Sequence, residues 1–401
     1  MLTFNYKAKD SKTGKIIKAT IQADSEAAAA KILMAQNIVP TEIAAAGNSQ
    51  GLSFGNKVSA KDRVIFTRQL ATMLNAGLPL AQSLATVSEQ TSSRALKQII
   101  LNVSASVSSG ATLGDSMAKY PKVFSTVYVA LVRAGETSGT LDTSLERLAN
   151  QQEHDADMMS KIRGAMIYPA IVLLVIIAVI VFMMVMLIPQ VESLYNDMNR
   201  ELPGMTQFLV GIVNFMFNFW YIVLGAAVGA VFLIRGWVRT EAGRKTWDTF
   251  KLNMPMFSSL FRRMYMARFS RTSETLLSSG VPLLEELKIA SDAVGNAVVR
   301  DEILSAAGSV KNGKPLSEGL SNKKYVLEFV PQMVKIGEQS GGIDTMFGKV
   351  ADYYEKEVDN AIKGISTLIE PILMVVMAGM IGFIVLAVLL PIYGLSDTSS
   401  L

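Results

Sequence analysis

The sequence predicts an all-α membrane protein with two homologous six-helix cytoplasmic bundles, three transmembrane helices and a small N-terminal α/β module. One observation behind this fold is composition: half of the 401 residues are hydrophobic and only 18% are charged, whereas charged residues make up about a quarter of an ordinary soluble domain. The others are three long uncharged stretches and an internal repeat in which the same glycines, prolines and leucines recur in order.

The first 43 residues have the pattern of the small α/β module. Phe4, Tyr6 and Ala8 alternate as in a strand, and Lys15–Gln22 and Ile38–Ile43 can form two more. Ser25–Gln36 between them is rich in alanine and predicts a helix. A Gly, Ser and Ala-rich linker follows over residues 44–59. No apolar signal-peptide core is present near the start, so we expect this end to stay in the cytoplasm.

The internal repeat becomes visible when the chain is shifted by 203 residues, and by 202 after one deletion. Phe66, Arg68, Leu74, Gly77, Pro79, Leu113, Gly135, Glu136, Gly139, Asp142, Glu153 and Pro169 then meet Phe269, Arg271, Leu277, Gly280, Pro282, Leu316, Gly337, Glu338, Gly341, Asp344, Glu355 and Pro371. Matches of this number and kind indicate a duplication. Each unit is a helical domain, over residues 60–168 and 235–370, followed by one span.

Two motifs within the repeat predict tight helix–helix turns. LNAGLPL at Leu74–Leu80 and LSSGVPL at Leu277–Leu283 place a glycine where a helix can end and a proline where the next can begin. GETSGTLD at Gly135–Asp142 recurs as GEQSGGID at Gly337–Asp344 and has the residues of another helix-breaking turn.

The acids of the second motif are candidates for interaction: Glu136 and Asp142, with Glu338 and Asp344 in the second unit. They can serve the turn alone, or they can reach a neighbouring subunit or a divalent cation. The run EHDAD at residues 153–157 adds nearby carboxylates, and its simpler interpretation is a solvated helix face. We therefore expect no bound cofactor or metal.

Three uncharged stretches predict the spans, at residues 170–188, 208–234 and 372–392. The first is long enough to cross the roughly 30 Å hydrocarbon core as a helix. Arginine and lysine are dense directly after residue 234, but the loop 189–207 has one arginine and the tail 393–401 has neither residue. The positive-inside rule thus places both helical domains in the cytoplasm and the C-terminus outside. The middle span has no counterpart in the repeat and returns the chain to the cytoplasmic side.

Four residues near the membrane are further interaction candidates. Tyr168 and Glu370 stand directly before the prolines that open the first and third spans, and Arg262 and Arg263 belong to the basic segment after the second. A carboxylate at the mouth of a span can contact a partner or simply reach water. The basic segment can be a topology signal and a contact for anionic lipid, or a docking surface for an acidic partner.

Several classes of chemistry find little support. The chain has no cysteine and one histidine, so thiolate and multi-histidine metal sites are excluded. GSVKNGKP at Gly308–Pro315 imitates a phosphate-binding loop, but Pro315 replaces the residue that would hold magnesium. We expect no enzymatic activity and no nucleic-acid binding. A duplicated membrane transporter is the alternative function, and the uninterrupted, charge-free spans argue against it.

With its duplication, LxxGxPL corners, GExSG turns and Tyr-Pro and Glu-Pro span entries, the chain resembles the inner-membrane platform proteins of type IV pilus assembly and the F component of type II secretion systems. The resemblance covers residues 1–396. It implies a multi-pass scaffold of the cytoplasmic membrane that forms a homo-oligomer. The partners it implies are a hexameric assembly ATPase, inner-membrane alignment proteins, and the transmembrane helices of pilins or pseudopilins, whose insertion or extraction the platform couples to the ATPase.

Overall fold

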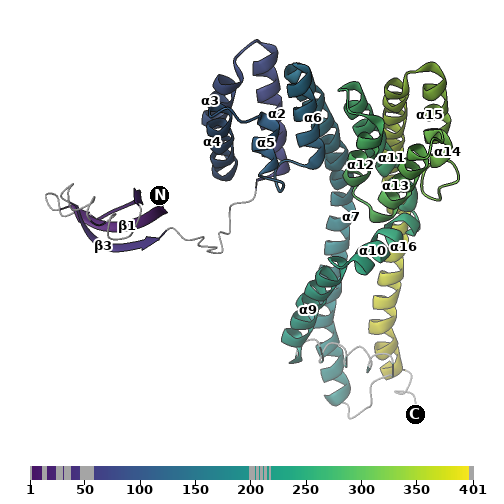
Figure 1. The fold of residues 1–401 in the computed structure, drawn as a ribbon. Coiled ribbons are helices and arrows are strands. Elements are labelled where there is room, and N and C mark those ends of the chain that lie inside the picture. The colour runs from purple at the N-terminus through teal and green to yellow at the C-terminus, as the bar shows by residue number, and fades with distance from the viewer. Residues whose placement is uncertain are drawn as a thin grey trace. The chain divides into compact units, whose positions relative to one another are not determined.

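A computed structural model describes residues 2–10, 16–23, 30, 38–45, 58–197, 204, 207, 211, 215 and 218–396. The chain divides into two units, Met1–Lys57 and Val58–Leu401. Figure 1 shows the elements of both units.

The N-terminal unit contains a three-stranded antiparallel sheet in the order β2-β1-β3. Its strands are β1 (Leu2–Asp10), β2 (Ile16–Ala23) and β3 (Ile38–Ala45). Tyr6 pairs with Ala19 on one side and Ile43 on the other, so the strands lie where the alternating pattern predicts them. Of the helix predicted at residues 25–36 only Ala30 is described, as helical. The α/β character of this module therefore stays a prediction.

The first repeat folds into six helices that begin with α2 (Ala60–Asn75). The others are α3 (Leu80–Gln90), α4 (Arg94–Ser108), α5 (Leu113–Ala118), α6 (Thr126–Ser138) and α7 (Leu141–Asp197). Ser59 and Asp62 form a reciprocal capping box that fixes the start of α2. Gly77 ends the first corner with φ +80° and Pro79 precedes α3. The predicted LxxGxPL corner is confirmed.

The second repeat has the same order of helices. They are α11 (Ser258–Ser278), α12 (Leu283–Ala293), α13 (Ala297–Lys311), α14 (Leu316–Leu320), α15 (Phe329–Ser340) and α16 (Ile343–Ser396). One helix was not foreseen. α10 (Glu241–Asn253) precedes the repeat and is held by buried Asp248, whose carboxylate accepts a hydrogen bond of 2.9 Å from the N–H of Ala297 at the start of α13.

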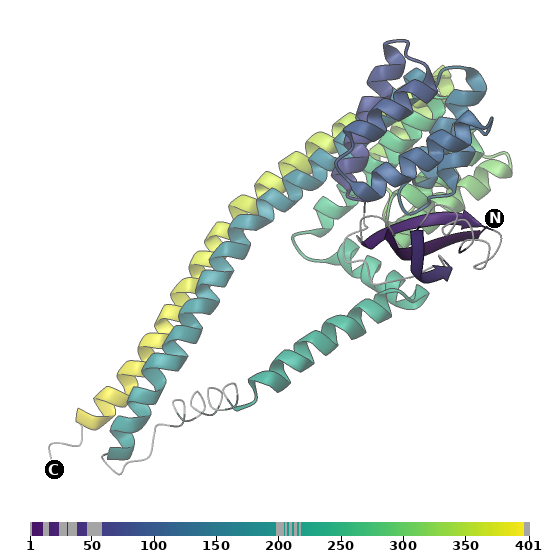
Figure 2. The ribbon, with the colours of Figure 1, turned by 90° about the vertical axis from the view of Figure 1, so that its left-hand side faces the viewer.

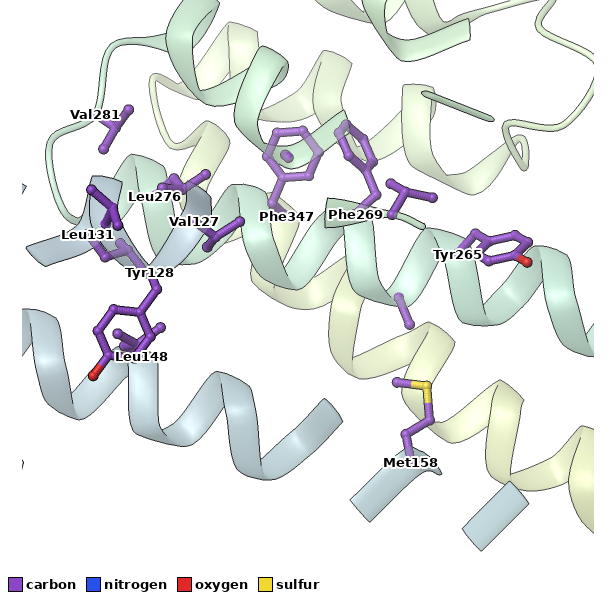
Figure 3. Packing of buried hydrophobic residues seen from close by; sticks show 14 of the residues in the cluster. Val127, Tyr128, Leu131, Leu148, Met158, Tyr265, Phe269, Leu276, Val281 and Phe347 are labelled. Atoms are coloured by element: carbon purple, nitrogen blue, oxygen red, sulfur yellow. The ribbon is translucent and has the colours of Figure 1, made fainter. Parts of the chain in front are cut away.

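The core is one continuous cluster that includes both repeats. Equivalent positions are fully buried in each, such as Phe66 and Phe269, Leu84 and Leu287, and Ile100 and Ile303. Burying a side chain of this size contributes about 1.5–3 kcal/mol. Figure 3 shows labelled members from both repeats, among them Tyr128 and Leu131 of α6 and Leu276 and Val281 of the second repeat. The two bundles thus share a hydrophobic interior.

The last helix of each repeat is very long. α7 has 57 residues and α16 has 54. Both continue without a break from the bundle through the proline at the predicted span entry, Pro169 or Pro371, as neighbouring helices in membrane proteins allow. Two parts, Leu141–Met183 and Ile343–Phe383, are long and apolar enough to cross a membrane. Figures 1 and 2 show the two helices side by side and running in the same direction.

The predicted middle span at residues 208–234 is only partly described. α9 (Trp220–Val238) is apolar and has Arg235 in its last turn. Its apolar segment Leu224–Val238 is shorter than a full span. The count of three transmembrane helices therefore stays a prediction.

Candidate functional site

The GExSG turn brings the end of α6 against the start of α7, and its two glycines have separate roles. A side chain on Gly135 would meet the Cβ of Ser144 at 2.8 Å and the Cα of Leu141 at 3.0 Å, so only glycine permits this approach. Gly139 has φ +73° and ends α6 in the left-handed conformation. Gly337 and Gly341 repeat both features before α16.

The glutamate of this motif caps a helix of its own bundle. The carboxylate of Glu136 accepts hydrogen bonds of 2.5 and 2.8 Å from the N–H groups of Leu113 and Gly114 at the start of α5. Glu338 accepts at 2.5 Å from the N–H of Leu316 and at 2.5 Å from the hydroxyl of Ser317 at the start of α14. A carboxylate here satisfies otherwise unpaired N–H groups and complements the helix dipole. A contact from these acids to another subunit stays a prediction.

The aspartates of the motif lie in the first turns of the long helices. Asp142 opens α7 and Asp344 opens α16, where a negative charge favours the helix dipole. Neither makes a hydrogen bond or ion pair within the described residues. A role for Asp142 and Asp344 in contacts with a partner stays a prediction.

A second repeated feature joins each long helix to the first helix of its bundle. It is a contact between an arginine and a carboxylate, here called an arginine tie. Arg68 of α2 donates to Glu153 of α7 through Nε at 2.7 Å and Nη2 at 2.5 Å, and to Asn150 at 2.5 Å. These bonds lower the pKa of the Glu153 carboxyl and raise the pKa of Arg68. A bidentate arginine–carboxylate pair fixes direction as well as distance.

The second repeat makes the same tie with more charge. Arg271 of α11 donates to Glu355 at 2.9 Å and to Asp352 at 2.5 Å, and also to Glu274 at 2.7 Å. Burial alone would lower the pKa of Arg271, but the hydrogen bonds to Glu355 and Asp352 outweigh it and raise the pKa. Its side chain is 16% exposed, compared with 33% for Arg68. We therefore expect the second tie to be the stronger.

The extra acid comes from different helices in the two repeats. Glu146 of α7 raises the pKa of Arg68 by its charge and accepts from Asn75 at 2.7 Å, while the α2 position facing it is Ala71. In the second repeat the acid is Glu274 on α11, and the α16 position is Gly348, where a Cβ would meet the Glu274 carboxylate at 2.6 Å. A glutamate thus stands near the arginine in both repeats, on the long helix in the first repeat and on the first helix of the bundle in the second.

Ion pairs also join the two repeats along the long helices. Lys161 of α7 pairs with Asp359 of α16 at 2.7 Å, and His154 lies 3.4 Å from Glu355. Nearer the start of α7, Asp155 lies 3.3 Å from Arg268 of α11. Partly exposed pairs of this kind contribute little stability singly, but they fix the register between the helices over the turns that precede the apolar segments.

The acidic run 153–157 is used in these ties. Glu153 binds Arg68, Asp155 pairs with Arg268, and Asp157 raises the pKa of Lys161 by its charge. In the described part of the chain no group of three or more His, Asp or Glu side chains is arranged to hold a metal ion.

The remaining predicted residues lie apart from one another. Arg262 donates to the carbonyl of Leu252 at 3.1 Å and stacks on Tyr325, and Arg263 pairs with Glu357 at 3.1 Å. Both arginines therefore hold the second bundle together. Tyr168 and Glu370 are exposed on α7 and α16 at equivalent positions, where a partner within or beside the membrane can reach them.

A buried carboxyl was missed by the sequence reasoning. Glu286 of α12 is 0% exposed, and neither of its oxygens has a hydrogen-bond partner with satisfactory geometry. Burial raises its pKa to about 8, and the nearby Ser273 hydroxyl offsets only part of this shift. The equivalent residue of the first repeat is Ser83. Burial therefore favours the protonated form of the Glu286 carboxyl around neutral pH.

The arginine ties were also missed, although all four partners stand among the residues that match between the repeats. Arg68 and Glu153 recur as Arg271 and Glu355. Opposite charges that are retained together in both halves of a duplication are the signal that could have paired them.

Two six-helix bundles of one design, each continued by a membrane-length helix and each tied to that helix by an arginine, define a duplicated, membrane-anchored helical scaffold. The sequence model described as "Type II secretion system (T2SS), protein F" matches residues 66–189 and again 269–391, and "Type II secretion system protein F, N-terminal domain" matches residues 1–44. The chain belongs to the type II secretion system protein F family, and the predicted duplication and resemblance are confirmed.

Curated relatives match over most or all of their length. The chain is 38% identical over 408 residues to "Type IV pilus assembly protein PilC" of Thermus thermophilus, covering 100% of both chains. It is 33% identical over 407 residues to "Type II secretion system protein F" of Vibrio cholerae, again covering 100% of both. A PilC of Myxococcus xanthus is 39% identical over 84% of this chain and 81% of its own.

Proposed function

We propose that the chain is the inner-membrane platform of a type IV pilus or type II secretion machine, and that it couples a cytoplasmic assembly ATPase to the insertion or extraction of pilin-like subunits. Its relatives are named for these two machines. The observation that carries the coupling is that each bundle and its apolar segment share one uninterrupted helix. A rotation of the bundle would then be transmitted to the membrane along one continuous helix.

The arginine ties support this transmission of movement along the long helices, which act as a lever. They clamp the first helix of each bundle to the long helix about five turns before the apolar segment begins, by the 3.6 residues per turn of an α-helix. The pair Lys161–Asp359 then joins the two long helices. A force on either bundle would move both helices together.

In this proposal α9 and the residues before it form the middle span, so that the N-terminus and both bundles are cytoplasmic and the C-terminus is external. The ATPase and the alignment proteins would contact the bundles, and Tyr168 and Glu370 would face pilin helices. The chain itself would act without catalysis. The parallel direction of α7 and α16 supports this topology.

Breaking the lever tests the coupling. Three flexible residues, Gly-Gly-Ser, would be inserted after Gly164 in α7 and after Gly364 in α16, below the ties. We expect the variant to reach the membrane and to retain the ATPase in pull-downs, yet to restore neither pili nor secretion in a deletion strain.

The matched control has the same insertion after Gly110, in the exposed turn between α4 and α5, and it should restore function. Normal assembly by the lever-broken variant would contradict the coupling. Normal assembly by the deletion strain itself would refute the platform role.

A further inference from the structure

Apart from the contact of the two long helices α7 and α16, the two repeats meet through unlike faces. The α5–α6 face of the first repeat lies against the α11–α12 corner of the second, around a groove of about 780 Å³. Arg147 of α7 donates to the carbonyl of Ser278 at the end of α11, and Gln151 donates to Thr272 at 2.8 Å. Val281 of the corner is only 7% exposed. This is a head-to-tail contact.

A head-to-tail contact between homologous units leaves one face of each kind unused. The first repeat keeps its own corner, α2–α3, and the second keeps its own α14–α15 face. Figure 1 shows these elements on opposite sides of the helical unit, so they cannot meet within one molecule.

The unused corner exposes apolar side chains where the used corner buries its residues. Leu78 is the counterpart of Val281 and is 37% exposed. Ile65, at the position of Arg268, is also exposed although Arg268 is mostly covered.

The unused face is hollowed at the equivalent place, although its lining is more polar. A groove of about 690 Å³ lies on it, and five of its lining positions are counterparts of residues in the first groove. Ser321, Glu328, Pro331, Gln332 and Lys335 correspond to Ala118, Thr126, Val129, Ala130 and Arg133.

Two large apolar side chains extend this face. Ile336 stands at the position of Ala134 and is 49% exposed, and Tyr353 stands at the position of buried Gln151 and is 45% exposed. Exposed apolar groups gathered on one face indicate a protein contact.

We propose that another molecule of this chain occupies each unused face: the α2–α3 corner of one molecule docks against the α14–α15 face of the next, repeating the contact that joins the two repeats. Leu78 then lies beside Ile336 of its neighbour, as Val281 lies beside the groove that Ala134 lines. Lys349, the counterpart of Arg147, reaches the end of the neighbour's α2.

The membrane limits which assembly can form when this contact is repeated from molecule to molecule. The offset of 202 residues is unchanged from the Gly135–Gly337 pair to the Pro189–Pro391 pair, so both bundles stand at the same height on their long helices. Successive molecules would keep the same height and direction in one bilayer. A heterologous contact without a rise closes into a ring when its rotation divides the full circle.

Thiol cross-linking of the purified full-length protein tests this contact, because the chain has no native cysteine. Leu78→Cys and Ile336→Cys molecules would carry different tags and be mixed in proteoliposomes with a short bismaleimide. We expect a cross-linked dimer that contains both tags and no dimer from Leu78→Cys alone. The double variant Ala134→Cys/Val281→Cys, at the equivalent positions within one molecule, calibrates the reach of the reagent.

A dimer of Leu78→Cys with itself would show a symmetric contact and overturn the proposal. The absence of mixed dimers, in an experiment in which the calibrating pair reacts, would also overturn the proposal. The α2–α3 corner would then have an occupant other than a second copy of this chain.

A second measurement uses surface charge. Leu78→Arg should convert the oligomer to monomers in detergent, whereas Leu101→Arg, at an equally exposed leucine of α4 that lines neither groove, should leave it intact. Equal behaviour of the two variants would contradict the proposal. The contact depends on the duplication and not on the platform role, so either idea can fail alone.

Discussion

The two repeats share a fold and a core but differ in where they keep charge. The first repeat has Ser83 in the interior of its second helix, and the second repeat has the neutral carboxyl of Glu286 there. The first has a half-exposed arginine tie, and the second has a more buried one with three acids around it. Duplication thus preserved the frame, which apolar packing determines, while the electrostatic interactions diverged. The buried carboxyl predicts that the stability of the second repeat depends more on pH.

The largest expected effect concerns Glu286. The native state keeps its proton up to about pH 8, whereas an unfolded glutamate releases it near 4.5. The unfolded state binds fewer protons between these values, so the free energy of unfolding falls as pH rises through this window, by on the order of 5 kcal/mol from this group. Glu286→Gln should remove the dependence and raise the melting temperature at pH 8 but not at pH 4.5.

Glu285→Gln, at the exposed neighbouring position, is the matched control and should retain the pH dependence. Thermal unfolding in detergent, followed by helical circular dichroism, measures both. An unchanged slope in Glu286→Gln would show that the carboxyl is ionised in the fold.

The arginine ties come next in size. Arg271→Ala leaves Glu274, Asp352 and Glu355 without their shared cation, and we expect a loss of about 2–4 kcal/mol in unfolding free energy. Arg68→Ala in the more exposed tie should lose about 1 kcal/mol. Denaturant titration of the purified variants gives both values, and equal losses would contradict the ranking by burial.

The helix caps should behave alike in both repeats. Glu136→Ala and Glu338→Ala each remove the acceptor of a helix N-terminus, and each should lower the free energy of unfolding by about 1–2 kcal/mol. If these glutamates instead bound a neighbouring subunit, the variants would change the oligomeric state at unchanged stability, which size-exclusion chromatography with light scattering would detect.

The smallest effect tests the exchange of an acid between helices. Gly348→Glu alone should destabilise the second repeat, because its side chain meets Glu274. Combined with Glu274→Ala, which restores the arrangement of the first repeat, it should be partly tolerated, with a coupling energy of about 1 kcal/mol. A double-mutant cycle measures this energy, and strict additivity would mean that the two positions do not substitute for each other.

Much of the fold followed from the sequence because it rests on local rules. The corner at Gly77, the turn at Gly139 and the duplication are readable from residue type and spacing. The extra helix α10 was not predicted because nothing in the repeat corresponds to it. The ties of Arg68 and Arg271 and the burial of Glu286 depend on which helices meet, and one unaligned sequence does not specify that. Glu136 was predicted to serve its turn or to reach a neighbouring subunit, and its hydrogen bonds to the start of α5 were not foreseen, because they too depend on which helices meet.

Labelling of introduced cysteines tests the central claim, that both repeats stand on the same side of the membrane. Ser109→Cys and Asn312→Cys are equivalent exposed positions in the two bundles, in a chain without other cysteines. A membrane-impermeant maleimide should leave both unlabelled in intact spheroplasts and label both after the membrane is opened. Labelling of one but not the other in intact spheroplasts would place the bundles on opposite sides and contradict the account.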